Sequence, residues 1–262
     1  MKLNKLIAIA TISLLSGGIS MAQKALNLED IVAGNIIQTK GIGSMTWLKD
    51  GERYSRLENN KQTGGTDIVA YRAKDNSREV IIPSSLLTDK STGRPIPVRS
   101  VSWSADNEKV LIYNNTRRVW RYDTRGDYWV LNLKDGALRQ LGKGMPESSM
   151  MFAKFSPDGT RVAYVSNNNI YVEDIDSGKI TQLTKDGSDT IVNGTFDWVY
   201  EEEFSCRDGF RWSPDGKHIA YWQSDTKGTG VFDIINNVDS IYAKVIHFPY
   251  PVSYTHLRAH ET

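Results

Sequence analysis

The chain has a single cysteine and no excess of charge of either sign. Cys206 is the only cysteine in 262 residues, so no intrachain disulfide can form. Lysine and arginine number 32, and aspartate and glutamate number 31, a balance that offers no basic surface to nucleic acid or to an acidic membrane. We therefore expect no nucleic-acid partner. The sequence also lacks the Gly-x-Ser-x-Gly motif that presents the nucleophile of an α/β-hydrolase.

Histidine is scarce and forms no motif for metal binding or thiol catalysis. A catalytic thiol needs a neighbouring base, and no histidine lies near Cys206 in sequence, so we interpret this cysteine as structural or incidental. His256 and His260 have the i, i+4 spacing of metal ligands, but the acidic residue of a zinc-protease motif is missing between them. The sequence therefore predicts no metal and no organic cofactor.

Long hydrophobic runs are also absent, apart from one at the N-terminus. Lys2 and Lys5 precede an apolar segment at residues 6–15, and residues 20–22 (Ser-Met-Ala) place small side chains at the two positions that matter for cleavage. The segment is much shorter than the roughly 20 residues that a membrane-spanning helix needs. We predict a signal peptide at residues 1–22 and export to the periplasm or the extracellular medium. An uncleaved anchor is the alternative.

What the chain does contain is a repeated turn that begins with an aromatic residue. Each copy continues through Asp to Gly or Asn, at a period of about 50 residues. The copies begin at Trp47, Trp103, Phe155 and Trp212. Asp caps such a turn through its side chain, and Gly or Asn tolerates the positive φ that the turn needs. An alternating strand follows each turn, most clearly at residues 161–165 and 218–222, and further strands follow at 169–174 and 179–184.

Several short strands in each unit of about 50 residues are typical of a β-propeller blade. A two-sheet sandwich is the alternative, but it would not repeat the same turn at this period. We predict an all-β fold with about four blades at residues 46–251, after an N-terminal segment at 23–45 with a brief helix near 27–32. Four blades of a larger ring would leave unpaired strand edges and an uncovered apolar face. A closed four-bladed ring is the other arrangement compatible with this count.

The most informative stretch is residues 197–204, Asp-Trp-Val-Tyr-Glu-Glu-Glu-Phe. On a short helical turn, neighbouring glutamates can converge on one cation such as a protonated amine, whereas on a strand they would point to opposite faces. The run lies in an excursion, residues 193–211, that is too long for a hairpin loop, and such excursions are usually functional. A second excursion at residues 119–125 carries Arg121. An exposed acidic turn without function is the plain alternative.

These segments resemble the dipeptidyl peptidase IV family of serine exopeptidases, which are related to prolyl oligopeptidase. Residues 193–204 resemble its glutamate-motif segment, and residues 119–121 (Val-Trp-Arg) resemble its substrate-arginine segment. Residues 212–216 and 248–251 match in order and approximate spacing, and the similarity runs over residues 26–251. The resemblance implies an eight-bladed propeller, of which this chain holds the N-terminal part. The propeller would cap an α/β-hydrolase domain, with the substrate between the two.

The resemblance also implies which residues bind the substrate. Glu202 and Glu203 would hold the protonated N-terminus of a peptide, and Arg121 would bind the carbonyl oxygen of the second-last residue before the cut. A free α-amine has a pKa of about 7.7–8.0, so it is largely charged at neutral pH and can donate charge-assisted hydrogen bonds to two carboxylates. Fixing the amine sets the release of dipeptides, X-Pro or X-Ala by family preference. We expect Glu201 to serve the local fold.

The remaining charged residues near these segments are expected to have structural roles. Arg125, Arg207 and Asp208 should form structural or surface ion pairs rather than bind substrate. His218 follows a repeated turn and is expected on a blade surface, and His247 has no evident acid or serine partner in the sequence.

In the family, the catalytic serine, acid and histidine lie in the hydrolase domain that follows the propeller. We therefore expect the native protein to continue beyond Pro251, and residues 252–262 to be a foreign read-through tail. The present chain would lack the triad and be inactive alone. Members of the family often form homodimers. The alternatives are a secreted, non-catalytic propeller that binds peptides or partner proteins, and a prolyl tripeptidyl peptidase.

Overall fold

The computed structural model describes residues 27–32, 41, 43–119 and 121–250. The chain divides into two units, residues 1–43 and residues 44–262. In the first unit, helix α2 (Leu28–Val32) confirms the brief helix predicted there. The predicted signal peptide at 1–22 and the tail at 252–262 lie outside the described residues. Within the described part, none of the helices has the length and apolar character that crossing a bilayer requires.

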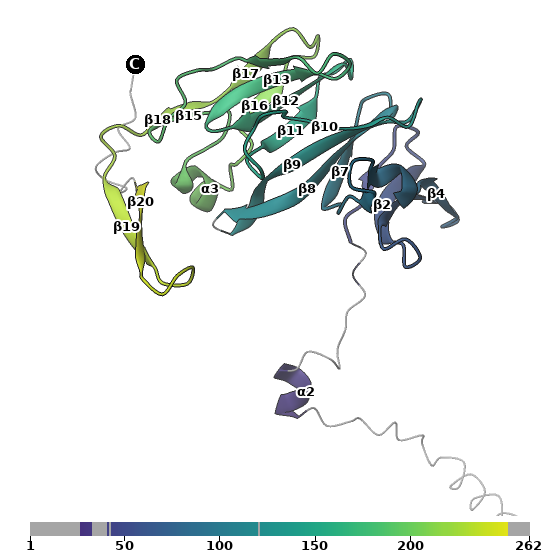
Figure 1. The fold of residues 1–262 in the computed structure, drawn as a ribbon, viewed down its shortest axis with the longest axis horizontal. Helices are drawn as coiled ribbons and strands as arrows, with labels where there is room; N and C mark the ends of the chain where they lie inside the picture. Colours follow the sequence, from purple (N-terminus) through teal and green to yellow (C-terminus); the bar gives the residue numbers. More distant parts are fainter. Residues whose placement is uncertain (1–26, 33–40, 42, 120, 251–262) are drawn as a thin grey trace, which may run out of the picture. The chain divides into compact units, whose positions relative to one another are not determined.

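The second unit begins with three four-stranded antiparallel sheets, each joined in chain order (Figure 1). The first sheet contains β1 (Thr46–Trp47), β2 (Arg53–Asn59), β3 (Thr66–Arg72) and β4 (Arg78–Ile82). The second contains β7 (Ser100–Trp103), β8 (Lys109–Val119), β9 (Tyr122–Asn132) and β10 (Leu138–Gln140). The third contains β11 (Met151–Phe155), β12 (Arg161–Ser166), β13 (Asn169–Asp174) and β14 (Ile180–Gln182). These sheets confirm the all-β, blade-like fold predicted from the repeats.

The fourth repeat forms smaller sheets and carries a helix. Its elements are β15 (Ile191–Asn193), α3 (Trp198–Phe204), β16 (Phe210–Trp212), β17 (Ile219–Tyr221), β18 (Gln223–Asp225), β19 (Val231–Asn236) and β20 (Lys244–Pro249). Strand β15 pairs with β18, β16 with β17, and β19 with β20. Between the first two blades lie η1 (Ser84–Leu87), β5 (Thr88–Asp89) and β6 (Arg94–Pro95). The described residues contain neither a closed ring of sheets nor an α/β-hydrolase domain.

The repeated turns have a common geometry, as their shared sequence predicts. The fifth residue of each turn has φ between 60° and 68°, at Gly51, Asn107, Gly159 and Gly216. In the last three turns a serine hydroxyl donates a hydrogen bond to the carboxylate two residues on. The pairs are Ser104–Asp106 at 2.6 Å, Ser156–Asp158 at 2.5 Å and Ser213–Asp215 at 2.6 Å. The Asp residues therefore organise these turns, and each turn starts the next strand.

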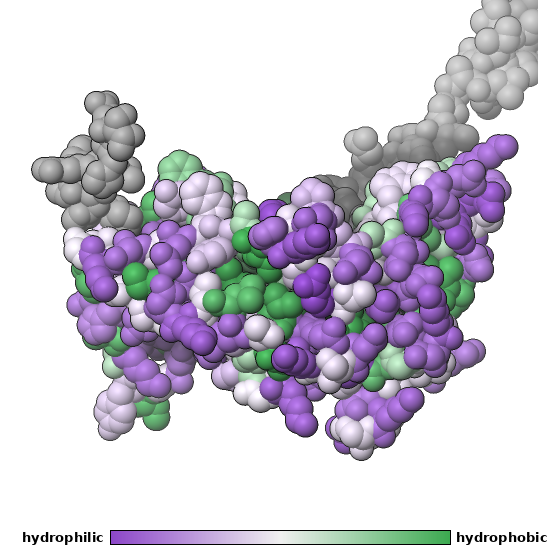
Figure 2. Space-filling view, turned by 90° about the horizontal axis from the view of Figure 1, so that it is seen from above, coloured by the Kyte–Doolittle hydropathy of each residue, from purple (hydrophilic) through white to green (hydrophobic). Residues whose placement is uncertain are grey.

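The core lies between successive blades. One apolar cluster joins the first and second sheets, with Ile68 and Ile112 fully buried. A second cluster joins the second and third sheets, with Tyr164 at its centre. A third places Phe210 of β16 against Val165 of β12, so that the fourth repeat packs on the third blade. The face shown in Figure 2 is covered largely by hydrophilic side chains around a smaller hydrophobic area.

Candidate functional site

The excursion that carries the acidic run leaves and re-enters the fourth repeat at one point. The Gly209 amide donates a hydrogen bond to the Gly194 carbonyl at 3.0 Å, and Thr195 forms an antiparallel bridge with Asp208. A Cβ atom on Gly209 would lie 2.9 Å from the carbonyl carbon of Gly194, and Gly194 itself has φ of 72°. Glycine at both positions therefore closes the base of the loop, and the loop holds α3 at a fixed place.

The acidic run folds as a helix because both of its ends are capped. The Asp197 carboxylate accepts a hydrogen bond from the Tyr200 amide at 3.0 Å, and Ser205 adopts the left-handed conformation that ends the helix. The Trp198 ring packs on Phe248 at a centroid distance of 5.5 Å, which ties α3 to β20. The helical arrangement predicted for the glutamates is therefore present in α3.

The helix directs its three glutamates differently, because consecutive helical residues are about 100° apart around the axis. Glu202 Oε2 lies 2.9 Å from Arg121 Nε. Glu201 Oε1 lies 3.4 Å from Arg207 Nε. The Glu203 side chain is exposed, and its carboxylate has no ion pair among the described residues. The structure thus brings Arg121 and Glu202 together, and leaves Glu203 free at the surface.

Arg121 reaches this helix from the tip of the long β8–β9 hairpin, which lies beside α3 in Figure 1. The strand register shifts after Asn114, and Gly126 pairs there with Met150 of the neighbouring blade. A Cβ atom on Gly126 would lie 2.6 Å from the carbonyl oxygen of Asn114, so this crowded crossing requires glycine. Trp120, part of the predicted substrate-arginine segment, lies outside the described residues.

The Arg121–Glu202 pair has an unusual electrostatic character. The Glu202 side chain is 8% exposed, whereas that of Arg121 is 76% exposed. Glu202 Oε2 faces Arg121, but Oε1 is buried and accepts no hydrogen bond. Leaving a buried acceptor unpaired is unfavourable, so a ligand that donates an N–H to this oxygen would gain binding energy. Helix α3 and the hairpin tip therefore bring together an exposed arginine and a buried carboxylate that has one unpaired oxygen.

The other charged residues behave largely as predicted from the sequence. Arg207 pairs with Glu201, and Asp208 pairs with Lys154 and, at 2.9 Å, with Arg211. Burial raises the pKa of the Glu201 carboxyl, and the neighbouring Arg207 guanidinium opposes that rise. These contacts support structural roles for Glu201, Arg207 and Asp208.

Two expectations about single residues need correction. Arg125 was expected to form an ion pair, yet among the described residues it has none; it lies opposite Arg117 across the hairpin, and burial and this neighbour lower its pKa. His247 was expected to lack an acid partner, but its Nδ1 lies 2.5 Å from Asp233 Oδ1. The β19–β20 pairing creates this contact, because it sets the two residues directly opposite each other. His218 is exposed on its turn, as predicted.

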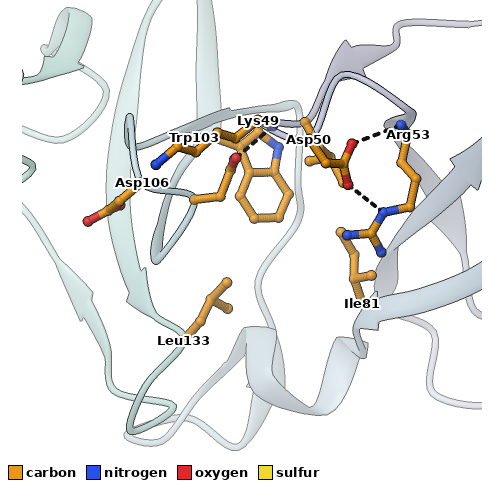
Figure 3. Close-up of a pocket in the computed structure, with 9 residues that line it drawn as sticks. Lys49, Asp50, Arg53, Ile81, Trp103, Asp106 and Leu133 are labelled. Carbon is orange, nitrogen blue, oxygen red and sulfur yellow. Dashed lines mark hydrogen bonds and ion pairs between the residues drawn. The ribbon is translucent and has the colours of Figure 1, made fainter.

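Two pockets elsewhere in the second unit are gaps between blades. Figure 3 shows one of about 450 Å³ between the first and second sheets, where Arg53 Nε already pairs with Asp50 Oδ2 at 2.7 Å beside Trp103. A second pocket of about 250 Å³ lies beside Trp212, between the third and fourth repeats. Equivalent turn residues line both of these pockets, so the two pockets result from the way in which the blades pack. Neither pocket includes residues of the α3 site. No group of three or more potential metal ligands gathers in the described part of the chain.

The blades define a propeller-type domain, and its fourth repeat carries the acidic helix α3. The family model for the dipeptidyl peptidase IV (DPP IV) N-terminal region matches residues 104–256, which is more than half of the chain. This chain therefore belongs to the dipeptidyl peptidase IV family and contains its N-terminal region.

Individual relatives agree with this assignment. Dipeptidyl aminopeptidase B of Saccharomyces cerevisiae is 30% identical over 240 residues, which is 86% of this chain and 27% of that protein. A probable dipeptidyl-aminopeptidase B of Chaetomium globosum is 36% identical over 135 residues, 51% of this chain and 15% of that protein. The crystal structure of Porphyromonas gingivalis dipeptidyl peptidase 4 superposes with a TM-score of 0.73 at 25% identity, covering 87% of this chain and 31% of that one. The chain thus spans less than a third of the length of each of these proteins.

Proposed function

We propose that this chain is the substrate-recognising part of an exported serine exopeptidase that releases dipeptides from the N-termini of peptides. In this proposal Glu202 and Glu203 anchor the protonated amine of the substrate, and Arg121 binds the carbonyl oxygen between the anchored residue and the next one. The family's preference for X-Pro and X-Ala is carried over by resemblance. The serine chemistry belongs to an α/β-hydrolase domain that would complete the protein.

The observation that carries the proposal is the buried, unpartnered Glu202 Oε1 beside the Arg121 ion pair. A protonated amine has three N–H donors, so it can satisfy this oxygen and still reach a second carboxylate. Glu203 follows Glu202 on the same helix and is exposed, so its side chain is available to turn toward the amine. An internal peptide nitrogen has one N–H and no charge, and would bind much more weakly. The arrangement therefore favours peptides with a free N-terminus.

The test is to replace both glutamates by glutamine in the full-length product of the native gene. We expect kcat/KM on a free-amine X-Pro chromogenic amide to fall at least about 100-fold. Each lost hydrogen bond to a charged group costs roughly 1.5–3 kcal/mol, and about 1.4 kcal/mol corresponds to a factor of ten. Glu108→Gln, at an exposed ion pair with Lys134, is the matched control and should leave kcat/KM unchanged.

The same assay separates the alternative functions. Unchanged kinetics in the double glutamine variant would overturn the assignment of the amine anchor. Mass spectrometry of products from an unlabelled peptide distinguishes dipeptide from tripeptide release. A full-length product that binds free-amine peptides but hydrolyses none of them would be the non-catalytic propeller instead.

A further inference from the structure

A second contact joins α3 to the β8–β9 hairpin, and Arg207 makes it. The guanidinium carbon of Arg207 lies 3.4 Å from the centre of the Tyr122 ring. Its Nε lies 3.4 Å from Glu201 Oε1. Tyr122 begins β9 and Glu201 lies on α3, so one side chain touches both the hairpin and the helix. Neither Arg207 nor Tyr122 was assigned a part in substrate binding from the sequence.

Arg207 is fixed mainly from the side of the excursion loop. Its carbonyl accepts a hydrogen bond from the Thr195 hydroxyl at 3.1 Å, at the closed base of the loop. Its side chain is 23% exposed and that of Glu201 is 12% exposed. The Tyr122 residue is 43% exposed and belongs to a hairpin tip in an irregular register. The excursion loop is therefore the more buried partner, and the exposed hairpin tip is the part that Arg207 can hold in place.

We propose that Arg207 and Tyr122 form a positioning clamp that holds the hairpin tip against α3 and so keeps Arg121 beside Glu202. This inference rests on the proposed function, because the position of Arg121 matters only if Arg121 and Glu202 bind the substrate. Arg121 occupies the turn at the hairpin tip, directly before Tyr122, the first residue of β9, so the two residues share one peptide bond. Stacking the Tyr122 ring on Arg207 therefore restrains the backbone to which Arg121 is attached, and so limits how far the Arg121 side chain can move from Glu202.

The charge of Arg207 adds a second element to the clamp. The charged groups that face Glu201 are Arg207, Glu202 and Arg125. Burial raises the pKa of Glu201, and Arg207 and Arg125 lower it. With Arg207 in place, Glu201 is held away from Arg121, and Glu202 alone among the described carboxylates pairs with Arg121. Removing the guanidinium would free Glu201 to compete for Arg121.

The experiment measures steady-state kinetics of the full-length product of the native gene on a free-amine X-Pro chromogenic amide. We expect Arg207→Met and Tyr122→Leu each to raise KM about tenfold with kcat changed less than about twofold, the size expected when a cation–π contact is lost. Tyr122→Phe keeps the ring and should behave as wild type. Arg207→Lys, which keeps the charge without the planar group, should recover part of the loss.

A double-mutant cycle tests whether the clamp acts through Arg121. In an Arg121→Met background, adding Tyr122→Leu should change KM by less than about twofold, because no positioned arginine remains to be lost. Independent, multiplicative effects of the two changes would overturn the clamp. An unchanged KM in Tyr122→Leu would also overturn the clamp. Because the Tyr122 ring is half-exposed, this variant remains a valid test if Arg207→Met fails to fold.

The two proposals fail in different ways. If Glu202→Gln impairs the enzyme while Tyr122→Leu leaves KM unchanged, the clamp is refuted and the amine anchor stands. If replacing both Glu202 and Glu203 by glutamine leaves the kinetics unchanged, the proposed function falls and the clamp falls with it. Melting temperatures of all variants, measured alongside, separate a loss of positioning from a loss of folding.

Discussion

At the scale of single residues, Glu173 is the most deeply buried acidic residue in the described part of the chain; its side chain is 1% exposed and lies between two blades. Its Oε1 pairs with Arg139 Nη1 at 2.7 Å, and its Oε2 accepts hydrogen bonds from the Gly142 amide at 2.8 Å and from the Tyr164 hydroxyl at 3.3 Å. Burial and this carboxylate raise the pKa of Tyr164, which therefore stays a neutral donor. Every polar atom of Glu173 thus has a partner on the second or third blade.

Replacing Glu173 by alanine should lower the free energy of unfolding by about 3 kcal/mol. The change leaves a buried amide and hydroxyl without an acceptor and an arginine without its charge partner. Glu108→Ala, which removes an exposed pair with Lys134, should cost less than about 1 kcal/mol. Urea unfolding followed by fluorescence measures both. Equal costs for the two variants would show that Glu173 does not join the blades.

The residues of the candidate site could be predicted from the sequence only in part. The acidic run stood out as three carboxylates behind aromatic residues, and Arg121 stood out through its segment. That Glu202 pairs with Arg121 depends on two excursions from different blades meeting, which no local pattern encodes. The roles inferred for Arg207 and Tyr122 depend on the same meeting. A single arginine beside an acidic run is the only sequence signal that could have suggested Arg207.

At the scale of elements, the repeated turns explain why strands begin where they do. In the last three turns the Asp carboxylate accepts a hydrogen bond from the hydroxyl of the Ser two residues earlier, and this hydrogen bond is the largest cause of the lowered pKa of the Asp. For Asp158 the pKa falls to about 2. The turns at Asp106 and Asp215 repeat the arrangement. Strands β12 and β13 were therefore predictable almost to the residue, since turn chemistry and alternation agree there.

The turns should make stability depend on pH in the acid range. Their folded pKa values lie below the ordinary Asp value near 3.8, so the turns stabilise the fold above that pH and lose this contribution as pH falls toward about 2. A variant with Asn at Asp106, Asp158 and Asp215 should melt at a lower temperature than wild type at pH 7. The difference should shrink between about pH 4 and pH 2.

The matched control for this titration is Asp189→Asn, at an exposed position with no hydrogen bond to its carboxylate among the described residues. It should leave the melting temperature unchanged across the range. A triple variant that stays equally far below wild type from pH 7 to pH 2 would contradict an electrostatic role for the turns.

The fourth repeat shows where element prediction ends. Its turn at Trp212 and its strand at Ile219–Tyr221 follow the repeat, but the four-stranded sheet of the other blades is replaced by pairs of strands. Strand β15 pairs with β18 across the excursion that contains α3. The excursion with α3 separates β15 from β16, where a short connection would otherwise join consecutive strands. The repeat period of the sequence contains no signal for the pairing of β15 with β18.

At the scale of the whole second unit, stability is distributed unevenly. Strand β12 packs between two apolar clusters, and its residues Val162 and Val165 are fully buried on opposite sides. The β19–β20 hairpin leaves large apolar side chains in contact with solvent, with Ile235 68% exposed and Ile241 at its turn 98% exposed. Its contacts with α3 run mainly through Trp198. The blades should therefore unfold together, and the hairpin should open by itself.

Amide hydrogen exchange measured by mass spectrometry on the intact chain tests this difference. Exchange requires opening, and a strand that opens only when two clusters separate needs more free energy than a hairpin that contacts α3 mainly through Trp198. We expect half-lives in β12 to exceed those in β19 and β20 by at least about 100-fold, corresponding to roughly 3 kcal/mol of opening free energy. Peptides from β8, which contributes Ile112 to a buried cluster, should follow β12. Equal protection of β12 and the hairpin would mean that something covers the exposed face of β19–β20 in solution.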